Sequence, residues 1–322
     1  MKKAIGLISG GLDSLLATRL IREQNYQVIG VHLITPFVPH FGQDTVDRLK
    51  QMSQQLNIKM NFISAGPEYL EIVKKPVFGY GQNLNPCVDC HIYMLREAKK
   101  IMALENADFV FTGEVLGQRP FSQNPSILQV IERQAGLEGL VLRPLSGLLL
   151  PLTRPEENGL VDRKRFLAIQ GKQRKVQLAI AQEKNLTDFG NPGGGCLLTV
   201  PSFCQRLADL MKAAPDFSLH DCWLLQVGRH FRIGESTKVI IPREEEESAR
   251  LRELRQPRDL LVSIEEYPDF TAIVQGKLTD LALELIAAYS PGQQPTVVLN
   301  TGEQKIRVSR KTKNIFAPFL IR

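Results

Sequence analysis

Apolar runs alternate with amphipathic stretches over the first 111 residues of the chain. The short apolar runs predict strands at 3–8, 27–34, 59–63 and 108–111. Between them, apolar residues recur at helical spacing over 13–24, 44–57 and 88–104. Strands and helices in this alternation form a parallel sheet with helices on both faces. The pattern therefore predicts a doubly wound α/β fold, in which ligands bind at the carboxyl ends of the strands.

The pattern changes in the second half of the chain. Two helical patches over 155–184 meet at Gly171, and a further helical pattern at 201–213 predicts a connecting helix. From Cys222 on, shorter segments predict strands in WLLQVGRHFRI, KVIIP, DLLVSI, TAIVQG and PTVVLN, and helices in REEEESARLRELR and 277–289. We therefore expect an α/β domain at 1–200, a linker helix at 201–214 and a smaller α+β module with a basic tail at 215–322.

A glycine-rich turn, Ser9-Gly10-Gly11-Leu12-Asp13-Ser14, joins the first predicted strand to the first predicted helix. Glycines let backbone N–H groups approach an anion closely, and the helix N-terminus adds about half a positive charge. Ser9 and Ser14 can add hydroxyl donors, and Asp13 can hold Mg²⁺ or cap the helix. The turn lacks both the Lys-Ser/Thr pair of a Walker loop and the G-x-G-x-x-G of a dinucleotide loop. A phosphate-binding loop of another type is therefore favoured over a simple capped turn.

A second glycine turn, Thr112-Gly113-Glu114, follows the predicted strand at 108–111. Because carboxyl ends of parallel strands share one edge of a sheet, this turn is expected beside the first.

Two cysteines open the predicted helix at 88–104, in the string Pro86-Cys87-Val88-Asp89-Cys90-His91. Four interpretations compete. The string matches a c-type haem attachment, which needs an exported chain, and no export signal is visible. The others are a zinc site with His91 as a ligand, a redox pair at a helix start, and an iron–sulfur cluster held by three cysteines.

A third cysteine, Cys196, follows the glycines at 193–195, whose backbone can wrap closely around a ligand. With a CxxC pair in the same chain, we favour one site shared by Cys87, Cys90 and Cys196 over a buried free thiol. Cys204 and Cys222 lie on apolar faces and are expected in the core.

Composition and charge narrow the class of protein. The 322 residues suffice for two domains, and the composition is that of an ordinary globular protein. The N-terminal apolar run is too short to span a membrane and no cleavage site follows it, so we expect a soluble cytoplasmic protein. In such a protein, five cysteines, an odd number, disfavour a disulfide framework.

The net charge of +6 is modest, so only clustered basic residues argue for a nucleic-acid partner. One cluster lies between 163 and 175 and another at 305–313. A run of charge is more often a solvated helix face than a set of phosphate contacts.

Four motifs occur in an order that resembles the PP-loop domain of tRNA thiouridine synthases: SGGLDS at 9–14, PCVDC at 86–90, TGEVLGQ at 112–118 and LRPL at 142–145. They are most similar to those of 4-thiouridine synthases, and the CxxC with a later Cys resembles the subgroup that uses a three-cysteine 4Fe–4S cluster. WLLQVGRHFRI weakly resembles the RNA-binding domain of ribosome-quality-control factors. Unlike typical 4-thiouridine synthases, this chain carries its additional module after the PP-loop domain.

The resemblance implies an adenine nucleotide alpha hydrolase-like fold and an enzyme that splits ATP into AMP and pyrophosphate. It would adenylate a uridine carbonyl of tRNA and replace the oxygen with sulfur from the cluster, as in 4-thiouridine formation. The implied partners are tRNA and a source of sulfur, either sulfide or a donor protein. The implied cofactors are ATP, Mg²⁺ and a 4Fe–4S cluster.

The resemblance also implies roles for individual residues. Asp13, Cys87, Cys90 and Cys196 would be catalytic, with the three cysteines holding the cluster and Asp13 holding Mg²⁺. The nucleotide would be bound by Ser9, Gly10, Gly11, Asp13, Ser14, His32, Thr112, Gly113 and Glu114. The candidates for RNA contacts are Arg119, Arg163, Lys164, Lys172, Arg174 and Lys175.

Two other functions stay open. A tRNA 2-thiouridylase would carry the sulfur as a cysteine persulfide and need no metal. A PP-loop ligase would insert sulfur into a small molecule or amidate it. An RNA-binding protein with a degenerate loop is disfavoured, because SGGLDS is complete.

Overall fold

The computed structural model describes residues 2–39, 43–186, 189 and 195–322. The chain divides into two compact units, Met1–Cys196 and Leu197–Arg322. Gly193 and Gly194 of the predicted glycine turn lie outside the described residues. In the described ranges, none of the helices is both long enough and apolar enough to cross a membrane.

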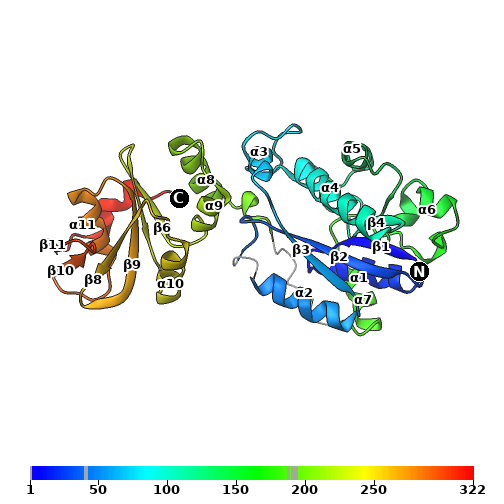
Figure 1. Cartoon of the computed structure of the whole chain (residues 1–322), viewed down its shortest axis with the longest axis horizontal. Helices are drawn as coiled ribbons and strands as arrows, with labels where there is room; N and C mark the ends of the chain where they lie inside the picture. The colour runs from blue at the N-terminus through cyan, green and yellow to red at the C-terminus, as the bar shows by residue number, and fades with distance from the viewer. Residues whose placement is uncertain (1, 40–42, 187–188, 190–194) are drawn as a thin grey trace. The chain divides into compact units, whose positions relative to one another are not determined.

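A parallel sheet of five strands forms the centre of the first unit (Figure 1). The strands are β1 (Lys3–Leu7), β2 (Gln27–Ile34), β3 (Lys59–Ser64), β4 (Phe109–Thr112) and β5 (Val141–Leu142). Their order in the sheet is β3-β2-β1-β4-β5. The chain therefore reverses direction across the sheet between β1 and β4, which is where doubly wound sheets bind ligands. The predicted α/β fold is confirmed.

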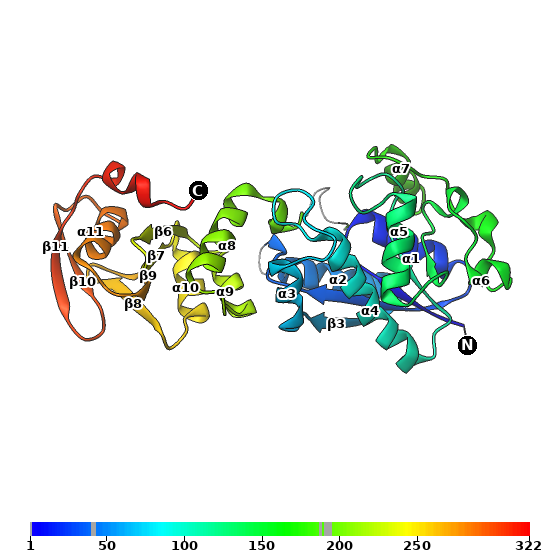
Figure 2. The same cartoon turned by 90° about the horizontal axis from the view of Figure 1, so that it is seen from above.

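Helices cover both faces of this sheet. They are α1 (Leu12–Arg22), α2 (Gln43–Gln55), α3 (Glu68–Lys74), α4 (Cys87–Glu105), α5 (Pro125–Ala135), α6 (Arg154–Glu157) and α7 (Lys175–Glu183). Figure 1 shows α4 and α5 on one face and α1, α2 and α7 on the other, and Figure 2 shows α4 and α5 from above, in front of the strands.

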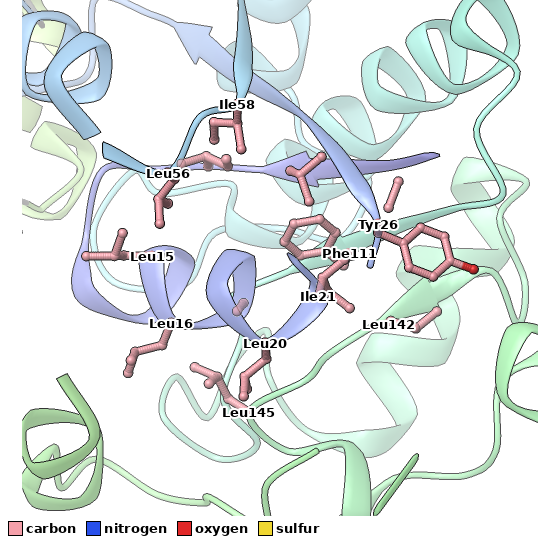
Figure 3. Close-up of a cluster of buried hydrophobic side chains, with 14 of the residues drawn as sticks. Leu15, Leu16, Leu20, Ile21, Tyr26, Leu56, Ile58, Phe111, Leu142 and Leu145 are labelled. Atoms are coloured by element: carbon pink, nitrogen blue, oxygen red, sulfur yellow. The ribbon is translucent and has the colours of Figure 1, made fainter. Parts of the chain in front are cut away.

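The amphipathic pattern of α1 explains how it packs. Its apolar residues at helical spacing face the sheet and form a cluster with residues of neighbouring strands and loops (Figure 3), among them Leu16, Leu20, Phe111, Leu142 and Leu145. On the opposite face, Val88 and Ile92 of α4 pack against β1, β2 and β4. Each large apolar side chain buried in this way contributes about 1.5–3 kcal/mol. The two clusters fix both helix starts at the same edge of the sheet.

Two helices of the first unit were missed by the hydrophobic pattern. α3 lies in a segment read as loop because of its many Gly and Pro residues. α5 has clear end signals: the Asn124 side chain accepts a hydrogen bond from the Ile127 amide, Pro125 occupies the first turn, and Gly136 closes the helix with φ 68°.

The second unit is an α+β module around an antiparallel sheet in the order β11-β10-β8-β9-β7-β6. The strands are β6 (Arg229–Ile233), β7 (Thr237–Ile241), β8 (Asp259–Ile264), β9 (Tyr267–Gly276), β10 (Thr296–Asn300) and β11 (Lys305–Ser309). The helices are α8 (Pro201–Ala213), α9 (Leu219–Leu224), α10 (Glu245–Leu254) and α11 (Asp280–Tyr289). α11 shares an apolar core with Phe270, Ala272 and Val274 of β9. α10 bonds to Thr271, which alternates with these residues and so faces the other side of the sheet.

Three segments of this unit differ from the sequence interpretation. Trp223 and Leu224, read as the start of a strand, lie in α9, because Ser218 and Asp221 form a capping box that begins a helix. The predicted connecting helix, α8, belongs to the second unit, where Asp209 binds Arg232 and Lys238. The basic segment at 305–313 begins with β11, which pairs with β10 and is not a free tail.

Candidate functional site

The predicted phosphate-binding loop connects β1 to α1. Gly10 has φ 80°, a conformation that glycine adopts without steric cost, and Gly11 is extended at the N-cap of α1. The Ser14 hydroxyl donates to the Gly11 carbonyl at 2.8 Å and lies 3.3 Å from the Ser9 hydroxyl. The loop therefore turns tightly and leaves the α1 N-terminus open to an anion.

The second glycine turn is in direct contact with the first. β4 pairs with β1, and Gly113 follows β4 at the same edge. A Cβ atom at position 113 would lie 2.5 Å from the Ser14 backbone nitrogen and 2.6 Å from the Asp13 carbonyl carbon. Only glycine permits this approach, so the two turns form one continuous backbone surface.

Asp13 stands at the centre of this surface. Gln118 Nε2 donates to its Oδ2 at 3.0 Å, and Arg174 Nη2 lies 3.6 Å from the same oxygen. Its other oxygen, Oδ1, is buried and has no hydrogen-bond partner among the described residues. A buried carboxylate oxygen without a partner is chemically suited to a divalent cation.

His32, predicted to bind the nucleotide, contacts the backbone just before the loop. Its Nδ1 lies 2.8 Å from the Ile8 carbonyl oxygen, where β1 leads into the loop. Burial lowers the pKa of His32, so the neutral ring donates its Nδ1 proton to this carbonyl.

The cysteine pair lies in the first turn of α4. Cys87 Sγ donates to Ser122 Oγ at 3.1 Å and lies 3.9 Å from His91 Nε2. Cys90 Sγ lies 3.0 Å from the hydroxyl of the buried Tyr69. Burial first, and then the nearby sulfur atoms of Cys90, Cys196 and Cys87, raise the pKa of Tyr69 well above its usual value. The three predicted cysteines therefore share one neighbourhood.

The two thiols of the pair differ in acidity. Burial raises the pKa of Cys90 to about 11. Burial also disfavours the Cys87 thiolate, but the hydrogen bond with His91 and its charge, the hydrogen bond with Ser122 and the charge of Arg119 lower the pKa of Cys87 to about 7. Near neutral pH, Cys87 is therefore the thiol of the pair that readily loses its proton.

A buried ionic network lies behind Cys87. His91 Nδ1 lies 2.7 Å from Glu114 Oε1, while Arg143 Nε and the Thr112 hydroxyl each donate to Glu114 Oε2 at 3.0 Å. Arg143 also pairs with Glu132. Burial favours neutral Glu114, but Arg143 and His91 outweigh it and hold the pKa of this carboxyl well below its usual range.

The sequence interpretation put Glu114 on the wall of the nucleotide site. Its Oε1 also contacts His91 of the cysteine helix, and its Oε2 accepts hydrogen bonds from Arg143 and Thr112. Sequence reasoning named neither Arg143 nor Glu132 as a site residue. The LRPL motif, which contains Arg143, was the available signal for the first of them.

All five cysteines lie in the described part of the chain, and none forms a disulfide. Cys204 and Cys222 are buried in the second unit, as predicted. In the ranges that the structure describes, no group of three or more His, Cys, Asp and Glu side chains is arranged to hold a metal ion.

One loop contacts both the phosphate-binding turn and the cysteines. Gly113 packs on Ser14, and Gln118 donates to Asp13. Glu114 follows Gly113 directly and binds His91. Further along the loop, the Ser122 hydroxyl accepts a hydrogen bond from the Cys87 thiol. The loop that follows β4 therefore holds the two predicted chemical centres side by side.

The six basic residues predicted to contact RNA have different surroundings. Arg119 is exposed near Cys87, and Arg174 pairs with Asp13. Arg163 is bound to Glu156 and the Leu150 carbonyl. Lys164, Lys172 and Lys175 are exposed.

The fold and the glycine-rich loop at the point of chain reversal define the class of the first unit, a doubly wound α/β domain with a candidate phosphate-binding loop between β1 and α1. Residues 1–149 match the family model described as thiamine biosynthesis protein (ThiI). Residues 228–316 match the model described as NFACT protein RNA binding domain. The chain thus combines a ThiI-type PP-loop domain with an NFACT-type domain, and both resemblances are confirmed.

Curated relatives match part of the chain. A probable tRNA sulfurtransferase of Thermococcus kodakarensis is 28% identical over 151 residues, 45% of this chain and 37% of the relative. A tRNA-specific 2-thiouridylase (MnmA) of Nitratidesulfovibrio vulgaris is 33% identical over 90 residues, 27% of this chain and 25% of the relative. The chain spans between a quarter and about two fifths of these relatives.

Among solved structures, a 4-thiouridine synthetase–RNA complex with bound ATP has a TM-score of 0.44 and 20% sequence identity. The similarity covers 69% of this chain and 53% of that chain.

Proposed function

We propose that this chain is an ATP-dependent tRNA sulfurtransferase that replaces a uridine carbonyl oxygen with sulfur. The observation that carries the proposal is the loop after β4, which contacts Asp13 through Gln118 and Cys87 through Ser122. ATP activates the carbonyl oxygen, and sulfur must then attack the carbon atom that carries this oxygen. An enzyme for this reaction therefore needs a phosphate-binding loop and a sulfur site side by side.

The PP-loop would perform the activation step. Backbone N–H groups at the α1 N-terminus and the Ser9 and Ser14 hydroxyls would bind the phosphates. Asp13 would hold Mg²⁺ through Oδ1, which is otherwise unpartnered among the described residues. The uridine oxygen attacks the α-phosphorus and pyrophosphate departs. Sulfur then forms a bond to the carbon atom that carries the adenylated oxygen, and this oxygen departs as part of AMP.

The three cysteines would supply the sulfur through a 4Fe–4S cluster. Their chemistry suits it, because thiolates are the preferred ligands of such clusters. The three cysteines also lie close enough to Tyr69 for each to raise its pKa. Cys87, Cys90 and Cys196 would hold the cluster, which would supply the sulfur as sulfide. The sulfur would come from sulfide or a donor protein. The Glu114–His91 pair would orient His91 toward the Cys87 sulfur.

The second unit would hold the RNA. Its match to an RNA-binding family supports this role, as does a cavity of about 190 Å³ lined by Arg206, Arg229 and Arg243. By resemblance, the product would be 4-thiouridine.

The test combines anaerobic purification with product analysis. Full-length protein should contain iron and sulfide, convert ATP to AMP and pyrophosphate in the presence of unmodified tRNA, and yield thiouridine on nucleoside mass spectrometry. Single Ser substitutions at Cys87, Cys90 and Cys196 should each remove both iron and thiolation. Cys204→Ala, in the second unit, is the matched control and should retain iron, as should His91→Ala.

Other outcomes identify the alternatives. Release of ADP and phosphate would contradict the PP-loop role. Thiolation by iron-free protein would indicate that a cysteine persulfide, and not a cluster, carries the sulfur. ATP turnover that needs a small amine or thiol acceptor and no tRNA would indicate a ligase acting on a small molecule.

A further inference from the structure

The N-terminus of α7 carries an unusual concentration of positive charge. Lys172, Arg174 and Lys175 lie at or just before its first turn, and that turn contains no acidic residue. Helix N-termini carry a partial positive charge, so basic residues there are unfavourable unless an anion lies nearby. Among the described residues, the ion pair recorded for this group is that of Arg174 with the Asp13 carboxylate.

The contact between Arg174 and Asp13 uses only part of the guanidinium. Arg174 Nη2 lies 3.6 Å from Asp13 Oδ2, longer than a good hydrogen bond. Arg174 Nε is buried without a hydrogen-bond partner among the described residues. The same holds for both amide atoms of Gln177, a fully buried residue one turn further along α7. An unpaired buried donor is costly, and a ligand that accepts hydrogen bonds would satisfy Arg174 Nε.

The start of α7 is held firmly against the loop that contacts Asp13. Gly171 N donates to the Leu116 carbonyl at 2.7 Å, and Leu116 and Gln170 form a bridge of parallel strand type. Further along, Ala181 of α7 is buried in the same apolar cluster as Leu16 of α1. These contacts hold the start of α7 beside the PP-loop, with Arg174 next to Asp13.

We propose that Arg174 and the first turn of α7 bind the pyrophosphate portion of ATP from the side opposite the PP-loop. This inference rests on the proposed ATP-dependent function. When Mg²⁺ and ATP bind, the Asp13 carboxylate passes to the cation and Arg174 passes to phosphate oxygens. The Arg174–Asp13 pair thus keeps each group in place until the nucleotide replaces both partners. Arg174 is then a nucleotide ligand and not an RNA contact.

The experiment compares ligands that differ only in their phosphates. Binding of ATP, pyrophosphate and AMP to the full chain is measured by calorimetry in the presence of Mg²⁺. Arg174→Ala should weaken ATP and pyrophosphate binding by about tenfold to a hundredfold, the size of one charge-assisted hydrogen bond, and leave AMP binding unchanged. Arg174→Lys, which keeps the charge, should recover part of the affinity.

Lys184→Ala is the matched control, because Lys184 caps the other end of α7 and pairs with Glu23. It should bind all three ligands as the wild type does. Circular dichroism shows whether each variant is folded. If Arg174→Ala does not fold, the binding measurements on Arg174→Lys test the inference.

Three results would overturn the inference. If wild-type protein binds ATP and Arg174→Ala binds it equally well, this inference fails and the proposed function stands. If Arg174→Ala weakens AMP as much as ATP, or weakens only tRNA binding, Arg174 is not a pyrophosphate ligand. If wild-type protein binds neither ATP nor pyrophosphate, the proposed function fails with it.

Discussion

Gly113 packs so closely on Ser14 that a Cβ atom at position 113 would lie 2.5 Å from the Ser14 backbone nitrogen. The contact joins the turns after β1 and β4 at the point where the chain reverses across the sheet. Since the obstacle is backbone at the start of α1, no side-chain rotation can relieve it.

Gly113→Ala should therefore destabilise the first unit by about 1–3 kcal/mol, the usual cost of overpacking. Gly11→Ala is the matched control, because Gly11 has φ −91° and its Cβ would only touch the Ser9 hydroxyl at 3.6 Å. Urea unfolding followed by circular dichroism measures both. Equal stability of the two variants would mean that the turns separate easily.

Asp13→Asn should reduce pyrophosphate release by at least about a hundredfold, as expected when an electrostatic interaction with reacting phosphates is removed. Its effect on stability should be small, because the Asp13–Arg174 pair is long and partly exposed. Pyrophosphate release and thermal unfolding are measured on the same preparation. Full activity in the folded variant would remove Asp13 from the reaction.

Asp209→Asn should destabilise the second unit by about 3–5 kcal/mol at neutral pH, because it leaves the buried Lys238 unpaired. Trp223, the single tryptophan of the chain, lies in this unit, so its fluorescence reports the transition. Glu265→Gln is a control, since its pair with Lys305 is exposed and should contribute little.

The same variant predicts a pH dependence. Burial opposes ionisation of Asp209, but Arg232 and Lys238 hold its pKa below the usual value of 3.8. A depressed carboxyl pKa stabilises the folded state above the unfolded-state value, and this stabilisation is lost as the pH falls through the folded-state value. The difference between the free energies of unfolding of wild type and Asp209→Asn should therefore shrink below about pH 4. A difference that grows in acid would contradict the assignment.

Arg206 and Arg229 should contribute to RNA binding. Burial first, and then the charge of Arg243, lower the pKa of Arg206 to about 10, and Arg206, Arg229 and Arg243 line the same cavity. Replacing both residues with Ala should weaken tRNA binding and reduce its salt dependence, by about 0.7–0.9 in logarithmic slope for each phosphate that is no longer neutralised. Filter binding at several salt concentrations measures both. Lys311→Ala, whose partner is Glu284, is the control.

The sequence by itself determined the parallel sheet, the PP-loop and the cysteine pair at the start of α4. These features are local: apolar periodicity sets strands and helices, and a glycine turn between a strand and a helix produces a phosphate site with little help from the rest of the fold. Helix α5 was equally local, but its signals were Asn124, Pro125 and Gly136, not its apolar pattern.

Only the tertiary structure decided which partners the charged residues take. Glu114 lies two residues from a strand end, yet its oxygens bind His91 and Arg143, which come from other elements. Arg174 was one of six basic residues predicted to contact RNA, and the packing of α7 against α1 and against the loop after β4 brought it to Asp13. Ion pairs between distant segments depend on distances of a few ångströms, whereas the hydrophobic pattern that builds the sheet tolerates many sequences. Fold was therefore readable from the chain, but the division of labour within the site was not.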